Sequence, residues 1–139
     1  MILLDTNVIS EVVKPNVNPT VKRWLQFQPL SELYLCDIVV MEQAYGGERF
    51  FLKTKSLKHL HKLDAVLEFY DGRILALTKE AAITGGKLRA RRESTGRPIS
   101  LQDAMIAATC LAHGATLATR NVKDFEGLDL RLVNPFEGA

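Results

Sequence analysis

Three acidic residues from distant parts of the chain have the types and positions that could bind a divalent metal ion. Asp5 directly follows an apolar run, Glu42 lies in a predicted helix after a second apolar run, and Asp103 lies in the first turn of another predicted helix. Hard cations such as Mg²⁺ prefer oxygen ligands and often bind a few carboxylates together with water and substrate phosphate. A metal held in this way can orient a water molecule, lower its pKa and stabilise the charge that develops when a phosphodiester is hydrolysed.

Each of these acids also has a purely structural explanation. Asp5 could cap the helix that follows it, and Glu42 could be an ordinary exposed helix residue. Ser100 and Asp103 have the spacing of a capping box, in which the serine caps the helix and the acid binds the serine's backbone amide. Residue types and spacing alone therefore leave both explanations open.

Histidine and cysteine offer no alternative chemistry. The chain has no CxxC pair and no histidine at metal-ligand spacing, so zinc is not expected. Cys36 and Cys110 both lie in apolar stretches and are predicted to be buried free thiols, which suits a reducing cytoplasm. No basic leader precedes the first apolar run and no segment is long enough to span a membrane, so we expect a cytoplasmic protein with no membrane partner.

Short apolar segments alternate with helical ones along the chain. Strands are predicted at residues 1–5, 33–36, 74–77, 117–119 and 130–133. Such alternation indicates right-handed crossover connections and a parallel sheet covered by helices on both faces. We therefore predict one α/β domain over residues 1–139, built as three α/β/α layers around a parallel sheet of about five strands.

Local residues also predict where the helices begin and end. The first helix would be capped by Thr6 or Asn7, and a second would open at Pro19. A third, which carries Glu42, would be capped by Asp37 and end at Gly46-Gly47. A helical stretch over 51–70 follows, then a helix from Lys79 with a weak point at Gly85-Gly86, and finally a helix from Ser100 that Gly114 ends. In an open parallel sheet, ligands bind beyond the carboxyl ends of the strands, so Asp5, Glu42 and Asp103 are predicted to share one crevice.

The net charge of +2 is too small to indicate a nucleic-acid partner, but the cations are unevenly distributed. One run contains Lys53, Lys55, Lys58, His59, His61 and Lys62, and the other contains Lys87, Arg89, Arg91, Arg92 and Arg97. Runs of this kind can follow a phosphate backbone, and they can equally be solvated helix faces.

Taken in order, the motifs resemble the PIN-domain family, and within it the VapC-type toxins of bacterial type II toxin–antitoxin pairs. The similarity lies in five blocks: residues 1–10 (MILLDTNVIS), 35–42 (LCDIVVME), 96–108 with Asp103, 117–125 and 134–136 (NPF). Each block is short and weak by itself, whereas the ordered set spans nearly the whole chain.

This resemblance implies a PIN-like fold and a Mg²⁺- or Mn²⁺-dependent endoribonuclease. It implies that Asp5, Glu42 and Asp103 bind the metal and that Thr6, Asn7 and Thr119 orient them. It also implies that the two basic runs line the approach of the RNA, with the residues of the second run as the named candidates for RNA contact. It further implies a homodimer and a cognate VapB-type antitoxin whose C-terminal segment covers the active site, with DNA contacted only through that antitoxin.

The chain departs from the family pattern at several positions. Asn121 stands where the family often has a fourth acid, which leaves Asp124 as another candidate, and Cys36, Val39 and Gln43 alter the second block. An impaired module that binds RNA or protein without cutting is therefore an alternative. A haloacid-type phosphohydrolase is a weaker alternative, because such enzymes need an aspartate where this chain has Asn7.

Overall fold

Five short parallel strands form the centre of the molecule. The computed structural model describes residues 1–138. The strands are β1 (Ile2–Leu4), β2 (Leu33–Cys36), β3 (Ile74–Leu75), β4 (Thr116–Ala118) and β5 (Leu132–Val133). They lie in the order β3-β2-β1-β4-β5, and every neighbouring pair is parallel. The predicted five-stranded parallel sheet is confirmed, although most of the strands are shorter than their apolar segments suggested.

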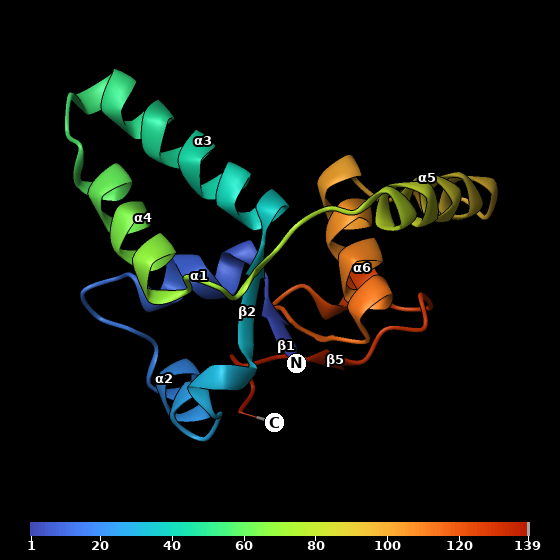
Figure 1. Cartoon of the computed structure of the whole chain (residues 1–139), viewed down its shortest axis with the longest axis horizontal. Helices are drawn as coiled ribbons and strands as arrows, with labels where there is room; N and C mark the ends of the chain where they lie inside the picture. The colour runs from blue at the N-terminus through green and yellow to red at the C-terminus, as the bar shows by residue number, and fades with distance from the viewer. Residues whose placement is uncertain (139) are drawn as a thin grey trace.

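Within residues 1–138, six α-helices connect and cover these strands. They are α1 (Thr6–Val12), α2 (Pro19–Gln26), α3 (Asp37–Thr54), α4 (Lys58–Phe69), α5 (Lys79–Ser94) and α6 (Leu101–His113), with 3₁₀ turns at Leu30–Glu32 (η1) and Val122–Phe125 (η2). Figure 1 shows α1 and α4 on one side of the strands and α5 and α6 on the other. The α3–α4 pair and the α5–α6 pair project as two arms, and within residues 1–138 none of the helices is long and apolar enough to cross a membrane.

The core forms where the apolar strands meet the apolar face of α6. Leu3 and Leu4 of β1 and Leu117 of β4 are fully buried, as is Ile106 of α6. Cys36 and Cys110 are buried free thiols, as predicted, and burial raises the pKa of both, which keeps them protonated and unreactive. A central strand buried on both faces holds the residue that follows it, Asp5, in a fixed position.

The prediction that Gly46-Gly47 ends the helix carrying Glu42 was wrong. Helix α3 continues through both glycines to Thr54, and the chain then turns at Lys55, whose φ of 63° is left-handed. A Cβ added at Gly47 would lie 2.8 Å from Cδ2 of Leu60 on α4, whereas one added at Gly46 would have no neighbour within 4 Å. Gly47 is therefore a contact point between two helices, and the helical stretch expected over 51–70 is divided between α3 and α4.

Gly85-Gly86 likewise does not interrupt a helix. Helix α5 runs unbroken from Lys79 to Ser94. A Cβ at Gly85 would lie 3.5 Å from Cβ of Ala108 and 3.5 Å from the Ala104 carbonyl oxygen, so this glycine lets α5 approach α6 closely. In both cases a tertiary contact overrides the low helix propensity of glycine.

Of the caps that the sequence offered for α1, Asp5 is the one observed, and it accepts a hydrogen bond from the Thr6 amide; Thr6 and Asn7 were wrong. The predicted cap of α3 was also wrong, because Cys36 rather than Asp37 precedes the helix, without a side-chain cap. The start of α6 at Ser100 and its end at Gly114, with a φ of 64°, are confirmed.

A matched pair of variants tests the contact between α3 and α4. Gly46→Ala should raise the free energy of unfolding by about 0.5–1 kcal/mol, because alanine favours the helix and meets no neighbour. Gly47→Ala gains the same propensity but must displace Leu60, so its free energy of unfolding should lie about 1–3 kcal/mol below that of Gly46→Ala. Urea denaturation of both variants measures the difference, and equal stabilisation would show that the helices do not meet at Gly47.

Candidate active site

The site lies where the strand order reverses, between β1 and β4. The chain leaves β1 towards β2 on one side, while β4 pairs with β1 on the other. Asp5 follows β1 and Thr119 follows β4, and the Asp5 amide donates to the Ala118 carbonyl oxygen at 2.9 Å. Ligand crevices of open parallel sheets form at such reversals, so the sheet topology places Asp5 where the sequence predicted a site.

Asp5 is held by hydrogen bonds to both of its carboxylate oxygens. Its Oδ1 accepts from the Thr6 amide at 2.8 Å, and its Oδ2 accepts from Oγ1 of Thr119 at 2.8 Å and from Nδ2 of Asn7 at 3.3 Å. Asp5 is only 5% exposed, and this burial raises its pKa, while the three hydrogen bonds act to lower it. The capping explanation and the site explanation for Asp5 are therefore compatible, because one oxygen caps α1 while the other belongs to a network of polar side chains.

Glu42 is linked to Asp5 through Thr6. The Thr6 hydroxyl donates to Oε1 of Glu42 at 2.6 Å, while the Thr6 amide donates to Asp5. Glu42 is half-buried on the first half of α3. Glu42 is therefore not an ordinary exposed helix residue, which was one of the two explanations considered for it.

Asp103 lies in the first turn of α6 and faces the same acids. Its amide donates to Oγ of Ser100 at 3.0 Å, which is the serine half of a capping box. Among residues 1–138 no hydrogen bond joins the Ser100 amide to the Asp103 carboxylate, so the reciprocal half is missing. Burial, followed by the charges of Asp5, Asp124 and Glu42, raises the pKa of Asp103 from 3.8 to about 6.

Asp124 is the fourth acid of this cluster. It lies in η2, and its charge raises the pKa of both Asp5 and Asp103. Asn121 is exposed nearby, and its amide donates to Oγ1 of Thr119 at 3.0 Å. The structure thus brings Asp124 as well as Asn121 next to the predicted acids.

The donor set of this cluster fits a hard divalent cation. Its ligand atoms are carboxylate oxygens whose mutual repulsion a cation would relieve. Within residues 1–138, no three His, Cys, Asp or Glu side chains already converge on one point. Mg²⁺ and Mn²⁺ often bind few protein ligands and complete their coordination with water and phosphate.

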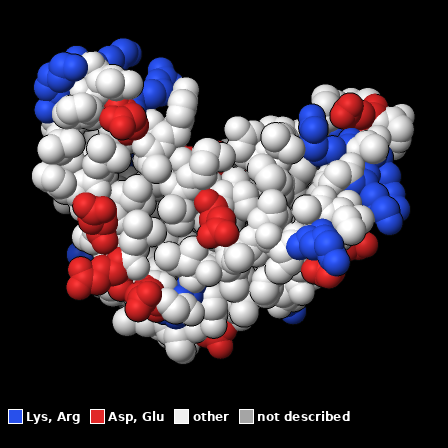
Figure 2. All heavy atoms as spheres, turned by 45° about the horizontal axis from the view of Figure 1, so that its top comes forward, with Lys and Arg blue, Asp and Glu red and all other residues white. Residues whose placement is uncertain are grey.

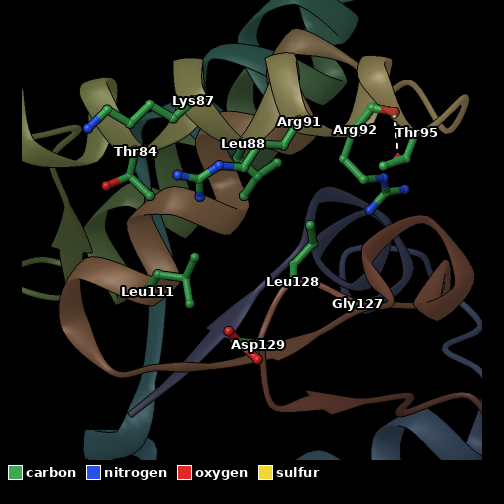
Figure 3. Close-up of a pocket in the computed structure, with 10 residues that line it drawn as sticks. All are labelled: Thr84, Lys87, Leu88, Arg91, Arg92, Thr95, Leu111, Gly127, Leu128 and Asp129. Atoms are coloured by element: carbon green, nitrogen blue, oxygen red, sulfur yellow. Dashed lines mark hydrogen bonds between the residues drawn. The ribbon is translucent and has the colours of Figure 1, made fainter.

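The second basic run has two structural roles that its spacing did not reveal. Lys87, Arg91 and Arg92 of α5 line a pocket of about 400 Å³ above Leu128 and Asp129 (Figure 3). The Arg92 guanidinium donates to three backbone carbonyls, those of Arg97 at 2.8 Å, Asp124 at 3.1 Å and Glu126 at 3.2 Å. Arg92 therefore fixes the turn that carries Asp124, while Arg89 is half-buried and Arg97 is exposed on the loop that follows α5.

Sequence reasoning missed this role of Arg92 because two of its three acceptors, the carbonyls of Asp124 and Glu126, are more than thirty residues away in the chain. No side-chain pattern predicts such partners. Arginine supplies several donors in a fixed planar geometry, which suits it to join separate segments of backbone.

Comparisons with known proteins agree with this geometry. The PIN domain model matches residues 2–129. The chain is 36% identical over 140 residues to the VapC ribonuclease Y4jK of Sinorhizobium fredii, with 100% of both chains covered. It is 36% identical over 137 residues to the toxin FitB of Neisseria gonorrhoeae, covering 98% of this chain and 99% of that one.

The solved structure of FitAB bound to an IR36 DNA fragment has the same fold. A chain of that structure superposes with a TM-score of 0.86 at 34% identity, covering 98% of this chain and 96% of that chain. The family model and both relatives span the segments that hold Asp5, Glu42 and Asp103. The chain therefore belongs to the PIN domain family.

Proposed function

We propose that this chain is the toxin of a toxin–antitoxin pair, a cytoplasmic endoribonuclease that hydrolyses RNA phosphodiesters with Mg²⁺ or Mn²⁺ bound by carboxylates. One observation carries this proposal: Asp103 lies close enough to Asp5, Asp124 and Glu42 for their charges to add to the effect of burial, and together they raise its pKa to about 6. Four acids gathered at a sheet edge destabilise the fold unless a cation binds them. The similarity to a VapC ribonuclease and to the toxin FitB supports RNA cleavage as the use of that cation.

Each residue has a specific part in this proposal. Asp5 and Asp103 bind the metal, and Glu42 binds it directly or through water. When bound, the metal polarises a water molecule and neutralises charge on the phosphate. Thr119 and Asn7 hold Oδ2 of Asp5, and Thr6 aligns Glu42 with Asp5 through its amide and its hydroxyl.

The protonation state of Asp5 explains why its carboxylate accepts three hydrogen bonds. Burial favours the protonated form of Asp5, and a protonated acid is a poor metal ligand. The bonds from Thr119, Thr6 and Asn7 favour the ionised form. They keep Asp5 available to a cation despite its burial.

Two alternatives account less well for the same residues. A haloacid-type phosphohydrolase would need an acid at position 7, where Asn7 instead donates to Asp5 and accepts from the Arg120 amide at 3.1 Å. A binding module without catalysis does not explain why four mutually repelling acids lie together. If the chain were such a module, Mg²⁺ or Mn²⁺ should not raise its melting temperature.

A toxin of this kind requires a protein partner that restrains it. We infer a VapB-type antitoxin and a homodimer, in keeping with the resemblance and with the relative FitB, which occurs in a DNA-bound FitAB complex. A groove of about 340 Å³ offers a surface for an apolar segment of such a partner. It is lined by Ile9, Val12, Val13, Lys62, Ala65, Val66, Phe69 and Tyr70.

Replacing either central acid tests the catalytic proposal. Asp5→Asn or Asp103→Asn should lower RNA cleavage in Mg²⁺ by at least about 100-fold, because each change removes a proposed metal ligand. Asp103→Asn should also raise the melting temperature at pH 7 without metal, because a like charge is removed. Cleavage of a labelled RNA and thermal melts measure the two effects.

Ser100→Ala is the control for Asp103. It removes the cap of α6 and should lower the free energy of unfolding by about 0.5–2 kcal/mol while sparing cleavage. Near wild-type cleavage by Asp103→Asn, or equal loss of cleavage in Ser100→Ala, would contradict the metal-ligand role.

The fourth acid is tested by two opposite changes. Asp124→Asn should weaken apparent Mg²⁺ affinity and stabilise the metal-free protein, because Asp124 already repels Asp5 and Asp103. Asn121→Asp should strengthen apparent Mg²⁺ affinity and destabilise the metal-free protein if position 121 also faces the metal. Thermal melts across a Mg²⁺ titration should then give curves that cross those of the wild type. Parallel curves for Asp124→Asn would remove Asp124 from the site.

A further inference from the structure

A groove between α1, α3 and α4 extends from the acid cluster towards the first basic run. It has a volume of about 500 Å³. Thr6 and Glu42 line one part of it, and Lys58, His59 and Lys62 line another. Of the first basic run, Lys53, Lys55 and His61 do not line it, so only part of that run shares a groove with a candidate catalytic acid.

The contact at Gly47 fixes the two kinds of charge relative to one another. Gly46 and Gly47 of α3 also line the groove, and Gly47 packs against Leu60, which lies between His59 and His61 on α4. A bulkier residue at position 47 would push α4 and its cations away from Glu42. The glycine that the sequence suggested as a helix end therefore sets the width of this groove.

Two of the groove's cations, Lys58 and Lys62, have no anionic partner among residues 1–138. The groove's Lys14, in contrast, is paired with Glu11 at 3.1 Å. Lys58 instead lies with Nζ 5.1 Å from the centre of the Phe50 ring, which also contacts the His59 ring edge-on at 4.4 Å between centroids. Burial, together with the charges of Lys58 and Lys62, lowers the pKa of His59, as expected where positive charge is uncompensated.

The wider surface carries cations on both arms, with acidic residues among them (Figure 2). Figure 2 shows Lys and Arg gathered on both arms, with the face hollowed between the arms. A ligand that lies along this groove must offer negative charge to α4 while it presents a reacting group to the acids. A nucleic-acid strand meets both demands, because one phosphate can reach the metal while its neighbours reach the lysines.

We propose that this groove binds the RNA strand beside the cleaved bond, with Lys58 and Lys62 contacting its phosphates. The inference rests on the proposed nuclease function and adds the path that the substrate takes. It predicts that Lys58 and Lys62 contact the RNA and that Lys53 and Lys55 do not, although all four lie in the same basic run.

Two charge-matched double variants test this path in the Asp103→Asn background, where cleavage is blocked. Lys58→Gln with Lys62→Gln alters the groove, and Lys53→Gln with Lys55→Gln removes the same charge from the same arm. The measurement is the Kd of a fluorescein-labelled single-stranded 12-mer RNA in Mg²⁺ at several salt concentrations. The groove variant should bind about 10-fold or more weakly, and the slope of log affinity against log salt should fall by about 1.4, because two contacts each contribute about 0.7.

The control pair should change the Kd by less than about threefold and leave the salt slope unaltered. Thermal melts establish that both variants remain folded, and a packing defect alone would not change the salt slope. Equal affinities and equal slopes for the two pairs would overturn the inference. Poly-glutamate serves as a second probe, which stands for an acidic protein. If the groove variant binds RNA as before but no longer binds poly-glutamate, the inference is also overturned, because the groove would then bind an acidic protein.

Cleavage of the same RNA by the chain with intact acids reports separately on the nuclease proposal. If the intact chain cleaves the RNA and the groove variant behaves like its control, only the substrate path is wrong. If the intact chain cleaves no RNA in Mg²⁺ or Mn²⁺, the nuclease proposal itself fails.

Discussion

Repulsion among four carboxylates at one edge of the sheet is the constraint on which the rest of the site depends. Asp5, Glu42, Asp103 and Asp124 come from four different elements, and their charges together with burial raise the pKa of Asp103 to about 6. Such an arrangement lowers the stability of the folded chain at neutral pH. The surrounding structure therefore has to hold the acids in place against their own repulsion.

Several features of the fold supply that restraint. The Asp5 amide is bonded to β4, and both Asp5 carboxylate oxygens accept hydrogen bonds from neighbouring residues. Arg92 attaches the Asp124 turn to α5 through backbone carbonyls, and Ser100 caps the helix that carries Asp103. Each acid is thus held by a different element, and a bound cation would relieve the repulsion among them.

The same interplay of charge extends beyond the acids. A groove with two unpaired lysines begins beside Glu42, so the molecule places uncompensated negative charge next to uncompensated positive charge. Within residues 1–138, Glu42 forms no ion pair with Lys58 or Lys62. A metal ion and a phosphodiester strand together would satisfy both.

Features that depend on local residues were predictable from the sequence. The buried strand before Asp5 and the helix between Ser100 and Gly114 follow from composition and capping, and both are present. The extension of α3 through Gly47 was not predictable, because the reason for that glycine is its contact with Leu60 on another helix. The sequence could not decide among Asp5, Thr6 and Asn7 as the cap of α1, because Asp5 serves both the helix and the site and residue spacing does not separate these roles.

The same division applies to the candidate site. Asp5, Glu42 and Asp103 were chosen from residue type, position and motif order, and the structure brings them to one edge of the sheet. The proximity of Asp124 depends on a turn that Arg92 holds in place, so nothing near Asp124 in the sequence indicated it more strongly than Asn121. Long-range hydrogen bonds to backbone carbonyls leave no pattern in the sequence.

The pKa of the Asp103 carboxyl, measured by ¹³C NMR with and without Mg²⁺, tests the central claim most directly. In the metal-free protein it should lie near 6, above the ordinary 3.8, so folding stability should fall as the pH rises between these values, because the native state holds the proton longer. The pKa of Asp103 should be lower in metal-free Asp5→Asn than in the metal-free wild type. Adding Mg²⁺ to the wild type should also lower it below 6. A metal-free pKa near 4 that neither Asp5→Asn nor Mg²⁺ alters would contradict the account, because Asp103 would then lie outside any cluster of acids.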